Sequence, residues 1–186
     1  MRDLWLNSGA IQRKSVQKLK KEIQGEETNI DLKRFTDVKI DVDFDLIIPK
    51  DYVANESERV SIYHRLVNIQ NPQDLANIEN ELQDRFGPVP QSVTLIIDAI
   101  ELKILAGKLF ASHIRLNKKN LILKFVDDLQ DVKEFHEKIV PGLMNYKETE
   151  VIFTGEQNSP HVQFILTSDS VNEQIEQAKN ILQNIV

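Results

Sequence analysis

The stretch Gln91–Leu109, QSVTLIIDAIELKILAGKL, decides how the rest of the chain can be arranged. Residues three and four positions apart lie on the same side of an α-helix. One side of this predicted helix carries Val93, Ile96, Ile97, Ile100 and Ile104. The nearly opposite side carries Leu95, Ala99, Leu102, Ala106 and Leu109. A helix that is apolar on two sides is buried between two layers. We therefore expect this segment to be the central helix of the fold.

Two amphipathic helices are predicted before the central helix. Asn55 with Glu58 forms a capping box that opens the first helix. Asn71-Pro72 opens the second, with asparagine as the cap and proline at the first position. The apolar stripes are Val60, Tyr63, Leu66 and Val67 in the first helix, then Leu75, Ile78, Leu82 and Phe86 in the second. Gly87 suits a left-handed helix exit, and Pro88 prevents continuation.

The strands are predicted to be grouped rather than to alternate singly with helices. Residues 38–46, VKIDVDFDL, alternate between apolar and polar positions and predict a half-buried strand. Hairpins are predicted around residues 118–120 and around residues 155–160. A helix over 131–146 should be kinked or ended by Pro141, and Ser170 with Glu173 opens a final helix. This order predicts an α+β fold with helices packed on a small, mostly antiparallel sheet.

Charge divides the chain into two predicted parts. Of the net charge of −6, residues 1–30 carry six basic and four acidic side chains, so the remainder carries −6 − 2 = −8. We interpret 1–30 as an N-terminal arm and linker, and 31–186 as the domain. An acidic domain repels a phosphate backbone, so direct nucleic-acid binding is not expected and a basic protein surface is the better partner. No apolar run is long enough to span a membrane, and no signal peptide is legible, so we expect a cytoplasmic chain without membrane contact.

The sequence contains no recognisable catalytic motif. There is no phosphate-binding loop, no dinucleotide fingerprint and no nucleophile elbow, and there is no cysteine. The four histidines, His64, His113, His136 and His161, are far apart in sequence. We therefore expect a domain that is not an enzyme and that has no catalytic residues, no cofactor-binding residues and no metal ligands.

One acidic run suggests a metal site and so defines a rival hypothesis. Asp41, Asp43 and Asp45 resemble the start of a calcium loop and could instead belong to a metal-dependent hydrolase. The calcium loop fails because Leu46 stands where glycine is needed and Tyr52 where a carboxylate is needed. A solvated strand face whose charges discourage edge pairing is the favoured interpretation.

A second acidic feature lies on the helix of residues 72–86. Asn77, Glu81 and Asp84 form a stripe that is turned away from the apolar positions of that helix. We expect both carboxylates to be exposed and free, so that reversing either to arginine would change the stability by no more than about 0.5 kcal/mol. Charged residues commonly face outward on helices, so solvation alone also accounts for this stripe.

Two segments carry a resemblance to a known family. LIIPKDYVANESERVSIYHRL (46–66) and NELQDRFGPVP (80–90) resemble the carboxy-terminal domain of bacterial transcription-repair coupling factors. The family pattern is filled by Pro49, Tyr52, Val53, Arg59, Tyr63, Arg65, Leu66, Glu81, Leu82, Asp84, Arg85, Phe86, Gly87 and Pro90. The resemblance is specific over residues 46–109 and looser elsewhere.

The resemblance implies a regulatory role. Full-length members are ATP-driven DNA translocases that act on stalled RNA polymerase and recruit UvrA; ATP and magnesium belong to that motor. In the family this domain docks in cis on a UvrB-like N-terminal module and masks the UvrA-binding surface. The resemblance places the interdomain contact on Glu81 and Asp84, with Arg85 either joining it or pairing with a local carboxylate. The alternative is a nucleic-acid-binding accessory module that uses the basic arm at 14–21 and the Lys118-Lys119 turn.

Overall fold

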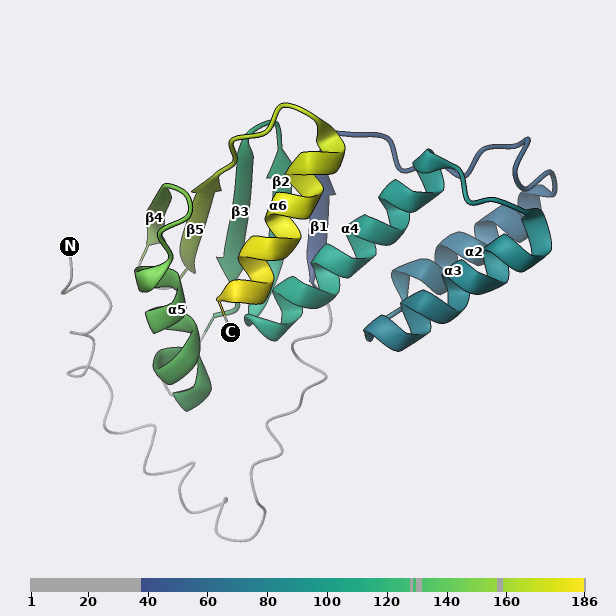
Figure 1. Ribbon diagram of the computed structural model, residues 1–186. Coiled ribbons are helices and arrows are strands. Elements are labelled where there is room, and N and C mark those ends of the chain that lie inside the picture. Colours follow the sequence, from purple (N-terminus) through teal and green to yellow (C-terminus); the bar gives the residue numbers. More distant parts are fainter. Residues whose placement is uncertain (1–37, 128, 130–131, 157–158, 186) are drawn as a thin grey trace, which may run out of the picture.

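The structure is a computed structural model that describes residues 38–185, except 128, 130–131 and 157–158 (Figure 1). Its elements in chain order are β1 (Lys39–Val42), α2 (Glu56–Val67), α3 (Pro72–Phe86), α4 (Gln91–Lys108), β2 (Ala111–Asn117), β3 (Asn120–Phe125), the π-helix η4 (Phe135–Ile139), α5 (Val140–Asn145), β4 (Val151–Glu156), β5 (Ser159–Ile165) and α6 (Val171–Asn184). The predicted arm, residues 1–30, lies outside the described residues. The domain boundary at residue 31 therefore stays a prediction.

The five strands form one sheet in the order β1-β2-β3-β5-β4. β1 runs parallel to β2, and the other neighbouring pairs are antiparallel. Helices α4, α5 and α6 lie on one side of this sheet, and the α2–α3 hairpin packs beside α4, away from the strands (Figure 1). The predicted α+β class and the mostly antiparallel sheet are confirmed.

The central helix is confirmed as the element between two apolar cores. One side of α4 contributes Val93, Ile96, Ile97, Ile100 and Ile104 to a cluster with α2 and α3. The other side contributes Leu102, Ala106 and Leu109 to a larger cluster with the sheet, α5 and α6. Ala99 is fully buried as well. Each core includes residues of α4, so a single helix joins the hairpin to the sheet.

The first strand is shorter than predicted. Burial still alternates through residues 38–46, but ladder pairing with β2 stops at Val42. β2 ends at Asn117, and the next residue, Lys118, donates its backbone N–H to the Asp43 carboxylate at 2.8 Å. The pairing of β1 with β2 thus ends close to the point where β2 itself ends and the chain turns into β3.

The apolar stripe predicted for α2 is rotated from the observed buried side. Val60 and Val67 are 49% and 56% exposed, whereas Ile62 and Leu66 are buried. The buried positions of α2 face α3 and α4 along Ile62, Tyr63 and Leu66. The prediction for Val60 and Val67 was wrong because their hydrophobicity alone does not fix how the helix is turned.

The helix predicted over 131–146 changes type just before Pro141 and does not end at this proline, since α5 continues to Asn145. Residues Phe135–Ile139 form a π-helix that continues directly into α5. Proline lacks a backbone N–H and so removes one hydrogen bond from a continuous helix. One position later, a Cβ on Gly142 would lie 2.1 Å from the Ile185 carbonyl oxygen. Glycine therefore allows α5 to approach the end of α6.

Candidate functional site

The α2–α3 hairpin is positioned by side-chain caps at both helix starts. Asn55 Oδ1 accepts from the Glu58 N–H at 3.0 Å, and Asn71 Oδ1 accepts from the Asp74 N–H at 2.9 Å. Helix α3 ends at Gly87, which has φ 87° and ψ −163°, a conformation essentially restricted to glycine. The two asparagine caps predicted from the sequence are thus confirmed. Helix α3 also ends at Gly87 as predicted, but ψ lies outside the left-handed helical region that was expected.

Two tyrosines and an arginine of the family pattern hold the segments around the hairpin. The Tyr52 hydroxyl donates to the Leu82 carbonyl at 3.0 Å, and its ring meets the Phe86 ring edge-on at 5.7 Å between centroids. The Tyr63 hydroxyl accepts from the Ile48 N–H at 2.6 Å. Arg59 Nη1 donates to the Val53 carbonyl at 2.7 Å. These contacts give each of these residues an intradomain role.

Four charged side chains form one network across α2 and α3, which we call the hairpin ion cluster: Glu58, Arg65, Glu81 and Arg85. Arg65 binds Glu81 through two parallel hydrogen bonds, Nη1–Oε1 at 2.8 Å and Nη2–Oε2 at 2.5 Å. Arg85 Nη1 donates to Glu81 Oε1 at 2.8 Å, and Arg85 Nη2 pairs with Glu58 Oε1. Two acids and two bases leave the cluster with no net formal charge.

The cluster corrects the expectation that Glu81 is a free outward carboxylate. Its side chain is 32% exposed, and both of its oxygens accept hydrogen bonds. The hydrogen bonds from Arg65, and then those from Arg85, lower the pKa of Glu81 to about 2. The helical projection of α3 correctly placed Glu81 off the apolar side, but it did not include the arginine that arrives from α2.

The other two predicted site residues differ from each other. Arg85 pairs with both carboxylates of the cluster, and its guanidinium lies 4.9 Å from the centroid of the Phe86 ring. Asp84 is exposed, and the structure gives it no hydrogen bond or ion pair with any described residue. Within the acidic stripe, Asp84 is thus a carboxylate available to an outside partner.

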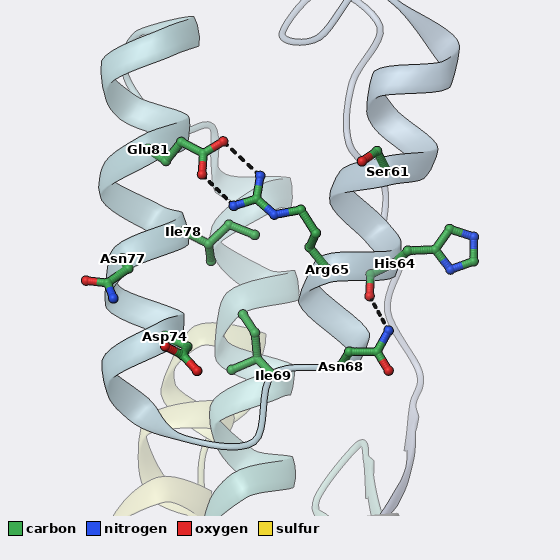
Figure 2. Close-up of a pocket in the computed structure, with 9 residues that line it drawn as sticks. All are labelled: Ser61, His64, Arg65, Asn68, Ile69, Asp74, Asn77, Ile78 and Glu81. Carbon is green, nitrogen blue, oxygen red and sulfur yellow. Dashed lines mark hydrogen bonds and ion pairs between the residues drawn. The ribbon is translucent and has the colours of Figure 1, made fainter.

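A groove runs between α2 and α3 beside the hairpin ion cluster (Figure 2). Ile69 and Ile78 contribute its apolar surface. Its polar lining consists of Ser61, His64, Arg65, Asn68, Asp74, Asn77 and Glu81. Arg65 and Glu81 reach toward each other across it, while the His64 ring points away (Figure 2). The sequence did not predict this groove, because the residue spacing within each helix does not show how far apart α2 and α3 lie.

The carboxylates proposed for a metal-dependent hydrolase are engaged elsewhere. Asp41 Oδ2 lies 2.9 Å from both Arg115 Nη2 and His113 Nε2, and Asp43 accepts from Lys118. Among the residues that the structure describes, no three histidine, cysteine or acidic side chains form a group suited to a metal ion. No described helix combines the length and apolar content needed to cross a membrane.

Fold and geometry together define a small α+β domain in which a charged helical hairpin is attached to a sheet through one central helix. The sequence pattern of the TRCF domain matches residues 42–134, which is half of the chain. The chain therefore belongs to the TRCF domain family.

Individual relatives agree with this assignment. A transcription-repair-coupling factor from Borreliella burgdorferi is 26% identical over 162 residues, which cover 86% of this chain and 13% of that protein. One from Staphylococcus aureus is 33% identical over 68 residues, or 37% of this chain and 6% of that protein. The chain thus corresponds to a small part of these relatives. The crystal structure of a C-terminal domain of transcription-repair coupling factor superposes with a TM-score of 0.66 at 15% identity, covering 80% of this chain and 91% of that one.

Proposed function

We propose that this chain is a regulatory docking domain of a transcription-repair coupling factor. In this proposal it binds in cis to a UvrB-like N-terminal module of its parent protein and masks a surface that would otherwise bind UvrA. The domain performs no chemical step and needs no cofactor of its own, and ATP and magnesium belong to the parent motor. RNA polymerase is then an indirect partner that acts through the motor.

The observation that carries the proposal is the position of Asp84. It is exposed on α3 beside an ion cluster whose other charges are already paired among themselves. The family pattern also contains this aspartate, and the described contacts give it no role inside the domain. An interdomain contact with a basic side chain accounts for both facts.

The geometry supports different roles for the three residues in the proposed contact. Asp84 is the primary contact, and Glu81 acts by holding Arg65 and Arg85 in place beside it. Arg85 borders Asp84 and is half exposed, so it can meet the partner without leaving Glu81. A partner therefore meets one unpaired acid next to a neutral cluster, rather than two free acids.

Such a contact suits a reversible restraint. Exposed ion pairs contribute about 0.2–1 kcal/mol each, and partly desolvated ones contribute more. Attachment to the same chain supplies an effective concentration on the order of millimolar, so a weak contact still closes. The same weakness lets the restraint open when the motor changes shape.

The test is the substitution Asp84→Arg in the full-length coupling factor. We expect UvrA binding to rise, because the reversed charge repels the basic partner surface. The stability of the domain should change by no more than about 0.5 kcal/mol, as at other surface sites. Titration calorimetry with purified UvrA and thermal unfolding of the domain measure the two effects.

One control variant makes this result specific. Asp127→Arg reverses an exposed carboxylate after β3 and should leave UvrA binding at the parental value. Glu81→Arg is not a clean probe, since it would place three guanidinium groups together and destabilise the hairpin. If Asp84→Arg and Asp127→Arg both bind UvrA like the parent, the docking assignment is wrong.

A further inference from the structure

The side of the sheet opposite the helices carries a row of basic side chains, although the domain as a whole is acidic. Strand pairing places Lys39 beside His113, His113 beside Lys124, and Lys124 beside His161. On β2 and β3 the neighbouring positions Ile114 and Leu123 are buried beneath the helices. The four side chains of this row therefore lie on the other side, one on each of four adjacent strands. Neighbouring strands are about 4.8 Å apart, so the row is about 14 Å long.

The charge of this row is poorly compensated within the domain. Lys39, Lys124 and His161 form no ion pair with a described carboxylate. The next row contains Arg115, whose partner Asp41 also lies beside His113. Counting Lys39, Lys124 and Arg115 against Asp41 gives 3 − 1 = +2 with both histidines neutral. This surface therefore has a net positive charge, which favours a partner that carries carboxylates.

The row that begins with Asp41 and Arg115 continues into two isoleucines on the strands beyond β2. Ile122 on β3 pairs with Gln163, and Gln163 pairs with Ile152 on β4. Ile152 is 36% exposed and Ile122 is half-buried. His113, Arg115, Ile122, Lys124 and His161 also line one small hollow in this surface. A partner that uses the whole surface therefore needs carboxylates along the basic row and apolar side chains beside Ile122 and Ile152.

We propose that this open side of the sheet is a docking surface for an acidic amphipathic helix of a partner protein. A helix that bears one carboxylate per turn presents them every 5.4 Å or so, close to the strand spacing of about 4.8 Å. Laid across the strands, it places carboxylates over Lys39, His113, Lys124 and His161 and an apolar stripe over Ile122 and Ile152. This proposal is independent of the contact proposed for Asp84, which lies on the hairpin.

Nucleic acid fits the same surface less well. A phosphate backbone gains nothing from Ile122 and Ile152, and the acidic remainder of the domain repels it. Sheets that bind single strands stack bases on aromatic side chains. The described positions on this side of the sheet include no aromatic residue, apart from the imidazoles of His113 and His161.

The test uses the full 186-residue chain labelled with ¹⁵N and three probes. The first is a 20-residue helical peptide with one glutamate per turn beside a leucine stripe, and the second is its scrambled counterpart. The third is a 20-base-pair DNA duplex. We expect the helical peptide to shift amide signals of β2, β3 and β5 in a salt-sensitive manner, and to bind more tightly than the other two.

Three variants test whether the helical peptide binds to the open side of the sheet. Lys124→Glu should weaken binding of the helical peptide by about tenfold, or about 1.4 kcal/mol, and Ile152→Asp should weaken it as well. Lys50→Glu makes the same charge change on the exposed loop before α2 and should alter the affinity by less than about twofold. The proposal is overturned if the scrambled peptide or the duplex binds this surface as tightly. It is also overturned if no probe shifts these strands, or if Lys124→Glu behaves like Lys50→Glu.

Discussion

The hairpin and the sheet region of this domain each have an apolar core, but they differ in the contacts that supplement it. In the hairpin, named polar atoms fix the chain: the hydroxyls of Tyr52 and Tyr63, the guanidinium of Arg59 and the hairpin ion cluster. In the sheet region, strand pairing and a large apolar cluster do most of this work. A polar contact requires a particular side chain, whereas an apolar position tolerates any residue of suitable volume.

The TRCF pattern covers the whole hairpin but only part of the sheet region. The TRCF pattern covers residues 42–134, which include the whole hairpin, α4, β2 and β3, but none of α5, β4, β5 and α6. The polar contacts of the hairpin use residues of the quoted family pattern, such as Tyr52, Arg65 and Glu81. The sheet region depends on side-chain volume and strand register, so we infer that fewer of its positions require one particular residue type.

The largest expected effect concerns whether the hairpin and the sheet region unfold as one unit or separately. Leu82 is buried in the hairpin core and Leu123 in the sheet core. Each Leu→Ala substitution should cost about 3–5 kcal/mol through lost burial and the cavity left behind. Because α4 belongs to both cores, we expect each variant to lower the stability of both regions together. Hydrogen exchange of α3 and β3 amides at several denaturant concentrations measures this.

A separable hairpin would give a different pattern. Leu82→Ala would then release the amides of α2 and α3 while the amides of β3 keep parental protection. The conservative change Leu82→Met, which nearly preserves volume, serves as the control and should cost less than about 1.5 kcal/mol. Loss of protection in the hairpin alone would show that α4 does not couple the two cores.

Most of the architecture was predictable because it depends on local sequence. The two-sided apolar pattern of residues 91–109 identified the central helix, and Asn55, Asn71, Gly87 and Ser170 marked helix ends that the structure confirms. The rotation of α2 was not predictable, since Val60 and Val67 are as apolar as the buried Ile62. A helix needs a partner surface before one of its sides becomes the inner one.

The candidate site was predictable only in part, because its geometry depends on two helices. The sequence placed Asp84 correctly on an exposed stripe of α3. It did not show that Arg65, sixteen residues before Glu81, would take up both oxygens of that carboxylate. The Arg65–Glu81 pair has no sequence spacing typical of helical ion pairs, which occur three or four residues apart. A tertiary contact of this kind becomes visible only when α2 and α3 are placed side by side.

The hairpin and the sheet region also differ in how deeply their ion pairs are buried. In the sheet region, Lys179 of α6 lies 2.7 Å from Asp98 Oδ1 and 2.6 Å from Glu101 Oε2 of α4. Its side chain is 13% exposed. Burial alone would lower the pKa of Lys179, but hydrogen bonds to Asp98 and Glu101 outweigh it and raise the pKa. This amine is therefore charged and is held between two helices.

Removing that amine should have a larger effect than any change in the hairpin ion cluster. Lys179→Met leaves Asp98 and Glu101 close together without a cation, and breaking such a partly buried pair costs about 3 kcal/mol. Arg65→Met, in the more exposed cluster of the hairpin, should cost less than about 1 kcal/mol. Urea unfolding at pH 7 compares the two variants. Equal losses would show that burial does not distinguish the clusters.

The smallest expected effect is a dependence on pH that originates at Glu81. Its pKa is about 2 in the folded chain and 4.5 as the ordinary value, so the unfolded chain binds more protons between these limits. The ion pairs of Glu81 therefore stabilise the fold fully above pH 4.5, and this contribution is lost as the pH falls toward 2. Because the side chain is 32% exposed and screened by solvent, the contribution should stay below about 1 kcal/mol.

Comparison of the parent with Glu81→Gln isolates this contribution. The difference in unfolding free energy should be largest near pH 6 and should approach zero near pH 2, because the protonated parent then resembles the variant. In 1 M salt, where the screening length is about 3 Å, the difference at pH 6 should also shrink. A difference that stays constant from pH 6 to pH 2 would mean that Glu81 acts through packing rather than charge. The hairpin would then be held, like the sheet region, chiefly by volume.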